Sequence, residues 1–398
     1  MRPALLPSIL FAAAALAGPP AGAAEFKPKK SRLNESDIQL AVHRGVSFLK
    51  TAAPPVYHMD DAPKRNRSET FMLYAMVSGG IAREDPVFQQ YLKIAVDLVP
   101  ERTYEVACAA MALAELDKAG YQWKLRQFAQ WLVDNQCRNG QWSYGEKIDL
   151  PDPPPAGPAA VASGPGGSNT APLYGTRTDG APADRGNTRT KAPIKQRRRG
   201  PESGDNSNSQ YAALGLRACA DAGFAIDPVC INDALKQWAK SQNRDGAWGY
   251  AEGWNWDQDP NRGYGCMTAG AVGAIAIYRW MLGQSAKVDP NAAAGCTWLA
   301  ANWRVDAVPA ADGMGASAFH YYYLYGLERV GMLIGINTIG GRDWYDEGGA
   351  LLLKQQREDG SWLSPNWNLG STDGPVWDTC FAILFLARAT KPLTYSKG

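Results

Sequence analysis

The feature that most constrains this 398-residue chain is a signature of Gln, three residues, Gly, one residue and Trp, which we call the QW signature. It occurs three times with identical spacing, and its members are Gln136, Gly140 and Trp142; Gln242, Gly246 and Trp248; and Gln356, Gly360 and Trp362. Each copy follows an apparently helical segment, so the Gly fits the position past a helix end, where a positive φ meets no Cβ penalty. We expect the Trp to fold onto a neighbouring layer while the Gln amide binds free backbone groups. The signature therefore predicts a structural role and a fold of repeated helical units.

Two kinds of helix alternate around these signatures. Six segments are apolar on nearly all sides, which is typical of helices buried on most sides: 69–76, 104–118, 208–221, 267–282, 319–334 and 377–389. Six amphipathic helices lie between them, and three of these open with an Asp-Pro pair, at Asp85, Asp227 and Asp289. There the Asp can accept backbone N–H groups while Pro occupies the first helical position. This alternation predicts one all-α domain of six helical hairpins over residues 25–392.

Two further segments differ from the repeats. Residues 1–24 have the basic start, apolar stretch and small-residue end of a signal peptide, so we expect a secreted or periplasmic protein. The remaining chain has no apolar run of the roughly 18 residues that could span a membrane. Residues 146–207 are rich in Pro, Gly, Ala, Ser and Thr and include a basic run at 185–199, which predicts a disordered insertion. That run is either solvated or in contact with an acidic partner.

Charge and cysteine content exclude several classes of protein. The 41 basic and 39 acidic side chains nearly balance, which argues against nucleic acid as the main partner. The seven cysteines form no C-x-x-C pair, which argues against a zinc knuckle and a disulfide scaffold. We expect most of them to be buried. A cross-link between Cys219 and Cys230, across a helical hairpin, stays open.

The QW signatures, together with the segment 376–382, resemble the repeats of squalene and oxidosqualene cyclases and of protein prenyltransferase β subunits. The resemblance covers about residues 38–392 apart from the insertion. It implies an α/α toroid, a closed α6/α6 barrel of six hairpins, whose lumen holds a long isoprenoid in the relatives. The repeat is specific for the fold and much less specific for chemistry.

The residues that carry chemistry in these families are incomplete here. The acidic cluster of squalene-type cyclases falls on 375–379, where Asp378 and Thr379 match but Trp377 stands at the proton-donor position. We expect Asp378, near a helix N-terminus, to be favoured as the anion. Asp257 and Asp259 form a local alternative pair that looks more like a surface loop and helix cap.

The zinc ligands of prenyltransferases fall on 264–266 and 378–380, where Cys266 keeps the ligand type and Asp378 could replace a second ligand. The chain has only three histidines, at positions 43, 58 and 320. We therefore expect neither a metal nor another cofactor.

If all inner helices begin at one end, their first-turn residues form a polar ring at the mouth of the lumen. Its expected members are Glu69, Glu105, Ser209, Thr268, His320 and Asp378, with Cys266. One interpretation pairs His320 with Glu105 or Asp378 as acid and base, which makes these three the candidate catalytic residues. In the other, the ring residues cap helices and bind the layer of QW signatures.

The segment 319–325 is dense in aromatic residues, with three successive tyrosines that point in directions about 100° apart. At least one ring should reach the lumen, where it either lines a ligand cavity or fills a helix interface. The candidate ligand-binding residues are Tyr264, Cys266, Tyr321, Tyr322 and Trp377. Glu328 and Arg329, which follow, are expected to form ion pairs with neighbours.

We thus expect a toroid without cyclase or zinc prenyltransferase chemistry that binds an extended isoprenoid, a glycan or a protein at the inner-helix mouth. The alternative is a divergent enzyme that acts on an isoprenoid through Asp378 or on a polysaccharide. A glycosidase needs two carboxyl groups about 5 to 9.5 Å apart. The candidates for such a pair are Glu69, Glu105, Asp257, Asp259 and Asp378.

Overall fold

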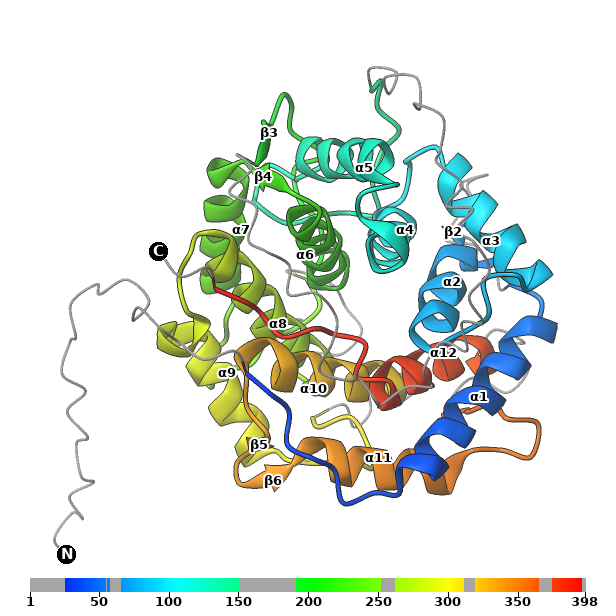
Figure 1. Ribbon diagram of the computed structural model, residues 1–398. Coiled ribbons are helices and arrows are strands. Elements are labelled where there is room, and N and C mark those ends of the chain that lie inside the picture. Colours follow the sequence, from blue (N-terminus) through cyan, green and yellow to red (C-terminus); the bar gives the residue numbers. More distant parts are fainter. Residues whose placement is uncertain are drawn as a thin grey trace, which may run out of the picture.

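Two layers of α-helix alternate along the chain. The computed structural model describes residues 26–54, 56–57, 66–150, 191–251, 262–310, 319–364 and 374–395. Within these ranges the outer layer is α1 (Glu35–Thr51), α3 (Pro86–Asp97), α5 (Gln122–Asp134), α7 (Pro228–Lys240), α9 (Pro290–Ala301) and α11 (Trp344–Gln355). The inner layer is α2 (Glu69–Ser78), α4 (Thr103–Asp117), α6 (Asn206–Asp221), α8 (Gly265–Met281), α10 (His320–Ile334) and α12 (Gly374–Leu386). Figure 1 shows the inner helices as a ring that the outer helices surround.

Short strands and one 3-10 helix join some of these helices. Strand β1 (Val56–Tyr57) pairs antiparallel with β2 (Asn66–Arg67), and β5 (Thr338–Ile339) does so with β6 (Arg342–Asp343). Strand β3 (Ala192–Ile194) pairs parallel with β4 (Phe224–Ile226), and the 3-10 helix is η1 (Ala286–Val288). The core itself is therefore helical.

The last hairpin closes the ring onto the first. Helix α12 packs on both α1 and α2. The third QW signature reaches the first helix, because the Gln356 amide donates to the Ala41 carbonyl at 2.8 Å. The Arg44 guanidinium in turn donates to the carbonyls of Arg357 and Glu358, both at 2.8 Å. These bonds join residues more than 300 positions apart and confirm the closed α6/α6 barrel.

The three QW signatures make the same bonds. Each indole Nε1–H donates to the carbonyl ten residues earlier, from Trp142 to Leu132 (2.7 Å), Trp248 to Trp238 (2.8 Å) and Trp362 to Leu352 (2.8 Å). Each Gln amide donates to the Gly carbonyl of its own signature and to the next outer helix, at Cys230, Asn291 and Ala41. The signature is therefore a joint between consecutive hairpins.

The Gly of each signature is required for two reasons. Gly140, Gly246 and Gly360 have φ values of 94°, 97° and 87°, which disfavour any residue with a Cβ. A Cβ there would also lie 2.4 to 2.8 Å from a carbonyl oxygen of the next outer helix. The outer helices can approach this closely only because no side chain intervenes.

The Asp-Pro helix starts are as expected. The side chains of Asp85, Asp227 and Asp289 accept hydrogen bonds from backbone N–H groups of α3, α7 and α9, at 2.9, 3.0 and 2.9 Å. The inner helices begin and end within three residues of the predicted bounds. Local sequence signals therefore place both layers well.

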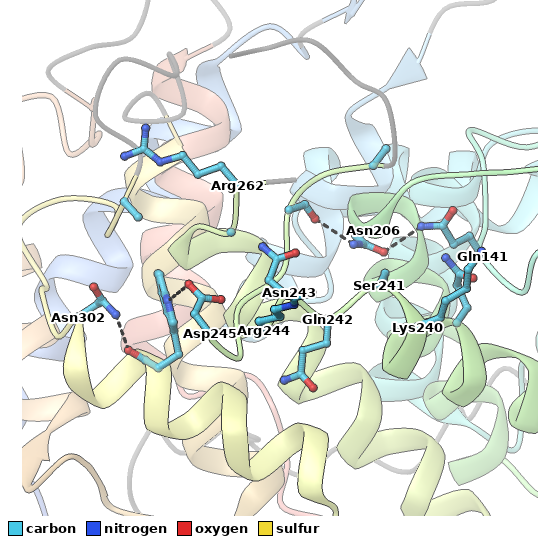
Figure 2. A pocket seen from close by; sticks show the side chains of 16 residues that line it. Gln141, Asn206, Lys240, Ser241, Gln242, Asn243, Arg244, Asp245, Arg262 and Asn302 are labelled. Carbon is cyan, nitrogen blue, oxygen red and sulfur yellow. Dashed lines mark hydrogen bonds between the residues drawn. The ribbon is translucent and has the colours of Figure 1, made fainter. Parts of the chain in front are cut away.

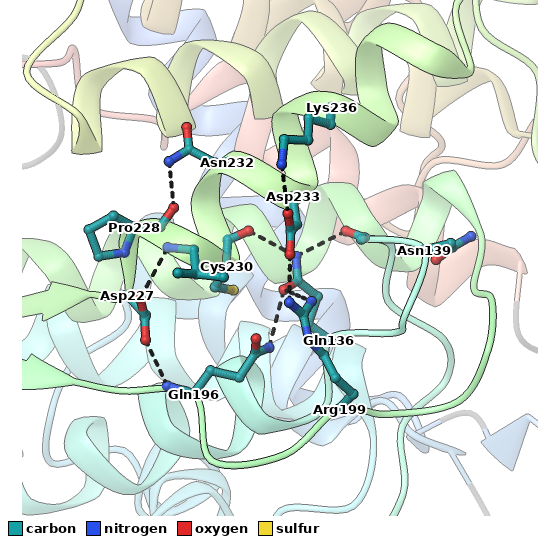
Figure 3. Close-up of polar contacts among 12 residues, drawn as sticks. Gln136, Asn139, Gln196, Arg199, Asp227, Pro228, Cys230, Asn232, Asp233 and Lys236 are labelled. Carbon is teal, nitrogen blue, oxygen red and sulfur yellow. Dashed lines mark hydrogen bonds and ion pairs between the residues drawn. The ribbon is translucent and has the colours of Figure 1, made fainter.

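The prediction of a disordered insertion over 146–207 is wrong for its last part, residues 191–207. Strand β3 pairs with β4, and Figure 3 shows Gln196 and Arg199 between the first QW signature and α7. Arg199 donates to the Gln136 amide oxygen at 3.1 Å and pairs with Asp233 at 2.5 Å. Gln196 donates through its backbone N–H to Asp227 at 3.0 Å. Residues 151–190 lie outside the described part.

The basic run is accordingly not simply solvated. Arg197 pairs with Asp134 at 2.6 Å, and Arg198 pairs with Glu146 at 3.0 Å. The Asp134 carboxylate is almost completely buried, so it needs a cation within reach. The composition of the whole segment concealed these specific partners.

All seven cysteines are free, so the alternative of a Cys219–Cys230 cross-link is wrong. The Cys219 thiol donates to the Leu125 carbonyl at 3.4 Å, towards α5. Six of the seven are buried, and Cys296 is partly buried. They act as small core side chains.

Candidate functional site

Hydroxyl groups near the start of three inner helices hold the QW layer. The side chains of Ser209, Thr268 and Thr379 accept the backbone N–H of the signature Trp at 3.0, 3.2 and 3.0 Å. Ser209 and Thr268 also donate to a carbonyl of their own helix start, at 2.6 and 2.9 Å. Ser209 and Thr268, two members of the expected polar ring, thus use their hydroxyl groups to bond backbone groups rather than a ligand.

Asp378 is buried near the start of α12. Its carboxylate accepts the backbone N–H of Ser364 at 2.6 Å. Burial raises the pKa of Asp378 well above its usual range, against the opposing effect of that hydrogen bond. The expectation that the helix N-terminus favours the anion is therefore wrong, because desolvation outweighs the helix dipole.

His320 begins α10 and is also buried. Its Nε2–H donates to the Val305 carbonyl at 2.7 Å, and burial lowers the pKa of the imidazole below its ordinary value. Glu105 is buried in the first turn of α4, three helices further around the ring. Among the described residues, no hydrogen bond or ion pair links His320 to Glu105 or to Asp378. The pairing of His320 with Glu105 or Asp378 as acid and base therefore stays a prediction.

Cys266 and Cys380, which stand at positions that match zinc ligands, lie in the apolar core. The Cys266 thiol donates to the Phe319 carbonyl at 3.6 Å, and burial raises the pKa of both the Cys266 and the Cys380 thiol. In the part of the chain that the structure describes, no group of three or more His, Cys, Asp or Glu side chains could hold a metal ion. Asp257 and Asp259 lie outside that part.

A chain of aromatic rings, which we call the lumen cluster, crosses the middle of the barrel. Its members are Phe71 of α2, Tyr104 of α4, Tyr211 of α6, Tyr322 and Tyr325 of α10, and Phe381 of α12. Ring centroids are 4.8 Å apart for Phe71–Phe381, 5.2 Å for Tyr322–Phe381, 6.2 Å for Tyr211–Tyr322 and 4.2 Å for Tyr104–Tyr211. The rings of five inner helices therefore touch one another where a lumen ligand would lie.

The three successive tyrosines of α10 separate as expected. Tyr322 enters the lumen cluster, and its hydroxyl is 2.9 Å from that of Ser207. Tyr321 instead donates to Gln355 of α11 at 3.0 Å. Tyr323 packs against α8, since a Cβ on Gly265 would lie 2.9 Å from its ring. Packing therefore accounts for all three rings.

Arg329 lies inside the lumen cluster and is 2% exposed. Its guanidinium stacks over the rings of Tyr325, Tyr211 and Tyr322 at 4.7, 5.7 and 5.9 Å and donates to Gln210 at 2.8 Å. The expected ion pair is absent among the described residues, because aromatic faces and an amide stabilise the cation instead. The neighbouring Glu328 is fully buried, and burial raises its pKa to about 8.

The C-terminal segment 387–395, which we call the C-terminal strap, covers the end of the barrel where the inner helices finish (Figure 1). The Thr390 N–H donates to Glu328 of α10 at 2.9 Å. Arg217 of α6 donates to the Pro392 carbonyl at 3.1 Å, and Trp280 of α8 donates to Thr394 at 2.7 Å. Leu393 of the strap is itself buried. The strap thus ties together the ends of three inner helices.

The opposite end of the barrel has a groove of about 780 Å³, which we call the mouth groove. It lies between the starts of α6 and α8 and the ends of α7 and α9, beside the second QW signature (Figure 2). Three cations line it, Lys240, Arg244 and Arg262. Six amides line it as well: Gln141, Asn206, Gln237, Gln242, Asn243 and Asn302. The volume is in the ordinary range of ligand sites, but the lining is unusually polar.

Hydrogen bonds fix part of this lining. Gln141 donates to Asn206 at 2.9 Å, and Asn206 donates to the Gly249 carbonyl at 2.9 Å. Asp245 accepts the indole N–H of Trp298 at 3.0 Å and the backbone N–H of Ala247 at 3.0 Å. Among the described lining residues Asp245 is the only carboxylate, so they include no pair of acids for hydrolysis.

Comparisons with known proteins place the fold. No protein-family model matches the sequence, and a comparison with curated proteins finds no significant match. Several solved structures are similar throughout. A variant of the type II terpene cyclase MstE from Scytonema, in complex with its substrate geranylgeranyl dihydroxybenzoate, has a TM-score of 0.51 and 14% identity over 89% of this chain and 97% of that chain.

Two proteins described as possible members of the GH105 family are also similar. The one from Klebsiella pneumoniae has a TM-score of 0.54 and 10% identity over 91% of this chain and 95% of that chain. The one from Salmonella enterica serovar Paratyphi A has a TM-score of 0.53 and 10% identity over 91% and 96%. The chain therefore has the α/α toroid fold that these structures share. At these identities the likeness concerns the fold and not the chemistry.

The toroid places its groove at the predicted end but builds it from other residues. None of Tyr264, Cys266, Tyr321, Tyr322 and Trp377 lines the mouth groove, and Tyr322 and Trp377 pack against other aromatic rings instead. The residues that do line it flank the second QW signature in sequence, at Lys240–Asp245. The polar run directly before Gly246 was the sequence feature from which this groove could have been predicted. No helix among the described residues of this toroid is long and apolar enough to cross a membrane.

Proposed function

We propose that this toroid is a secreted or periplasmic binding protein that holds an extended polar ligand in the mouth groove. The observation that carries the proposal is the contrast between a lumen occupied by aromatic rings and a polar groove at the mouth. A lumen ligand would have to displace rings whose contacts stabilise five inner helices. A ligand in the mouth groove would displace only water.

The groove also favours binding over catalysis. Its described lining has one carboxylate, Asp245, and both oxygens of that group accept hydrogen bonds from the protein. General acid–base chemistry on a glycan needs two carboxyl groups at a defined separation. The signal peptide expected at residues 1–24 supports a location outside the cytoplasm, where extended polar polymers are accessible.

The experiment uses isothermal titration of the mature protein with three probes: neutral dextran, oligogalacturonate and geranylgeranyl dihydroxybenzoate. We expect at least one polar chain to bind, and Ser241→Trp to abolish that binding because Ser241 lines the groove. Thr297→Trp is the matched control, since Thr297 is exposed on α9 and does not line the groove. The proposal is overturned if neither polar chain binds, if Ser241→Trp binds normally, or if the geranylgeranyl probe binds or is converted.

One observation favours a second candidate, an enzyme that protonates an isoprenoid. Burial holds the carboxyl group of Asp378 protonated to a higher pH than usual, as a general acid for an alkene requires. Conversion of geranylgeranyl dihydroxybenzoate that is lost in Asp378→Asn, with an unchanged melting temperature, would support this candidate. Under our main proposal no conversion occurs in either protein.

A further inference from the structure

Arg329 is a buried cation whose charge no described residue neutralises. Its side chain is almost inaccessible to water, and no carboxylate among the described residues forms an ion pair with its guanidinium. Three tyrosine rings and the Gln210 amide oxygen contact the guanidinium instead. Aromatic faces stabilise a cation only in part, whereas taking a charge out of water without a counterion is very costly. The lumen cluster thus surrounds a charge that needs a further partner.

The titratable groups beside Arg329 do not supply that partner. Oε1 of Glu328 accepts the Thr390 N–H at 2.9 Å, towards the C-terminal strap. Burial raises the pKa of Glu328 to about 8, so this carboxyl group is mostly neutral at pH 7. Burial also raises the pKa of the nearby Cys108 and Cys266 thiols, which are therefore neutral too. These groups leave the charge of the guanidinium uncompensated.

Three buried hydrogen-bond donors around this guanidinium have no acceptor in the protein. They are Nε of Arg329 itself, the amide nitrogen of Gln210 and the hydroxyl of Tyr211. Gln210 and Tyr211 are neighbours on α6, and both contact the guanidinium, Gln210 through its 2.8 Å bond and Tyr211 through its ring at 5.7 Å. Buried donors normally have an acceptor, so three unpartnered donors around one cation point to a bound acceptor.

Charge and size decide what kind of acceptor fits. A water molecule accepts two hydrogen bonds at most and leaves the charge uncompensated, whereas an anion can accept all three and neutralise the guanidinium. A divalent anion would leave a buried negative charge in turn, so a monovalent one is favoured. Tyr322, whose ring lies 5.9 Å from the guanidinium, keeps 7% of its surface accessible to water. The rings therefore leave room for a species of about the size of a water molecule.

We infer that the lumen binds one small monovalent anion, such as chloride, against Arg329, Gln210 and Tyr211. The anion neutralises the buried guanidinium and accepts hydrogen bonds that no protein group accepts. Such an ion fits between the rings without displacing them, unlike a long ligand. The site lies inside the ring of inner helices, so this inference does not depend on the proposed function at the mouth groove.

The test is equilibrium dialysis of the mature protein at pH 7 against radioactive chloride, with sodium gluconate to keep the ionic strength constant. We expect about one chloride per chain with a Kd of about 1 mM, the strength that a few charge-assisted hydrogen bonds provide. Bromide should displace the chloride because its size and charge are similar, and sulfate should not. In crystals grown with bromide, the anomalous signal should lie beside Arg329.

Two arginine variants test the cation. Arg329→Met should abolish chloride binding. The matched control is Arg217→Met, which removes another buried arginine of an inner helix. Arg217 has its own carboxylate partner, Asp221, at 3.5 Å, so its loss should leave chloride binding unchanged.

Two tyrosine variants test the donors and decide the question if Arg329→Met does not fold. Tyr211→Phe removes only a hydroxyl group without a partner in the protein, so it should fold normally and bind chloride at least tenfold more weakly. The matched control is Tyr278→Phe. Its hydroxyl is also buried and unpartnered, but its ring stacks on Trp142, so chloride should bind normally.

Several outcomes would overturn the inference. It fails if the wild type binds no chloride, if Tyr211→Phe binds chloride as tightly as Tyr278→Phe, or if sulfate displaces chloride as well as bromide does. If Glu328→Gln binds chloride and the wild type does not, an ionised Glu328 is the counterion and the inference fails as well. The proposed function is tested separately, through Ser241→Trp at the mouth groove, and stands or falls by that result.

Discussion

The two ends of this toroid are built for different purposes. At the strap end, Glu328 and Arg217 are buried and hydrogen-bonded to residues 387–395, and Leu393 of that segment is buried as well. At the mouth, Lys240 and Arg244 are exposed and have no charged partner among the described residues. One end therefore contributes mainly to the stability of the closed ring. The other keeps polar groups available, at little benefit to folding.

Removal of the strap should produce the largest effect. Truncation after Arg388 leaves Glu328 without the Thr390 N–H, Arg217 without the Pro392 carbonyl, and the site of Leu393 open to water. We expect the free energy of unfolding to fall by about 3 to 5 kcal/mol, since buried polar groups then lose their partners. Urea unfolding measures the loss.

The control for the truncation is Lys391→Ala, which removes only an exposed ion pair with Glu115 and should change stability by less than about 1 kcal/mol. Ligand binding at the mouth should persist in the truncated protein under conditions where it remains folded. A truncated protein that is as stable as the full chain would contradict the role given to the strap.

Gly360→Ala should produce the next largest effect at constant pH, because it disturbs the joint that closes the ring. Its φ is 87°, and a Cβ there would lie 2.5 Å from the Arg44 carbonyl oxygen. We expect a loss of about 3 kcal/mol, from backbone strain together with the displaced helix. The matched variant is Gly80→Ala, with a φ of 78° but no atom within 4 Å of the added Cβ.

Gly80→Ala should lose only about 1 kcal/mol, from backbone strain alone. Both variants are compared by urea unfolding. Equal losses in the two would show that the contact between the third QW signature and α1 does not carry the closure of the ring.

The pH dependence of stability should distinguish the buried end from the mouth. The folded pKa of Glu328 is about 8, above its ordinary value of 4.5. The folded protein therefore retains a proton that the unfolded chain releases, so this group's contribution is complete below pH 4.5 and is lost as the pH rises through 8. Glu328→Gln is neutral at every pH and should lack this loss.

Between pH 5 and pH 9 we expect the wild type to lose about 4 kcal/mol more than Glu328→Gln. Thermal unfolding at pH 5, 7 and 9 gives the difference, in which the other titrating groups cancel. Parallel pH profiles for the two proteins would mean that Glu328 is ionised in the folded state.

The smallest effect on stability should come from the mouth groove. Lys240→Glu combined with Arg244→Glu removes no ion pair with a described residue, so the free energy of unfolding should change by less than about 0.5 kcal/mol. Thermal unfolding without ligand measures it. A large loss would show that these cations contribute to folding and would remove the contrast between the two ends.

Most of the fold was accessible from the sequence, whereas most of the candidate site was not. The QW signatures and the Asp-Pro starts act through bonds to nearby backbone, so their spacing places the helices within a few residues. The partners of Arg197 and Arg199 lie on α5 and α7, up to 63 positions away, and composition gave no sign of them. Asp378 shows the same limit, because its protonation depends on how deeply α12 is buried.

The sequence by itself determined the alternation of buried and amphipathic helices and the joints between hairpins, since these follow from hydrophobic periodicity and from residues with special backbone preferences. Only the tertiary structure decided that rings from five inner helices occupy the lumen, that residues 387–395 cover one end, and that the cations beside Gly246 line a groove at the other. The physical reason is that these features depend on which distant side chains meet when the ring closes. The spacing of residues along the chain does not specify which distant side chains come into contact.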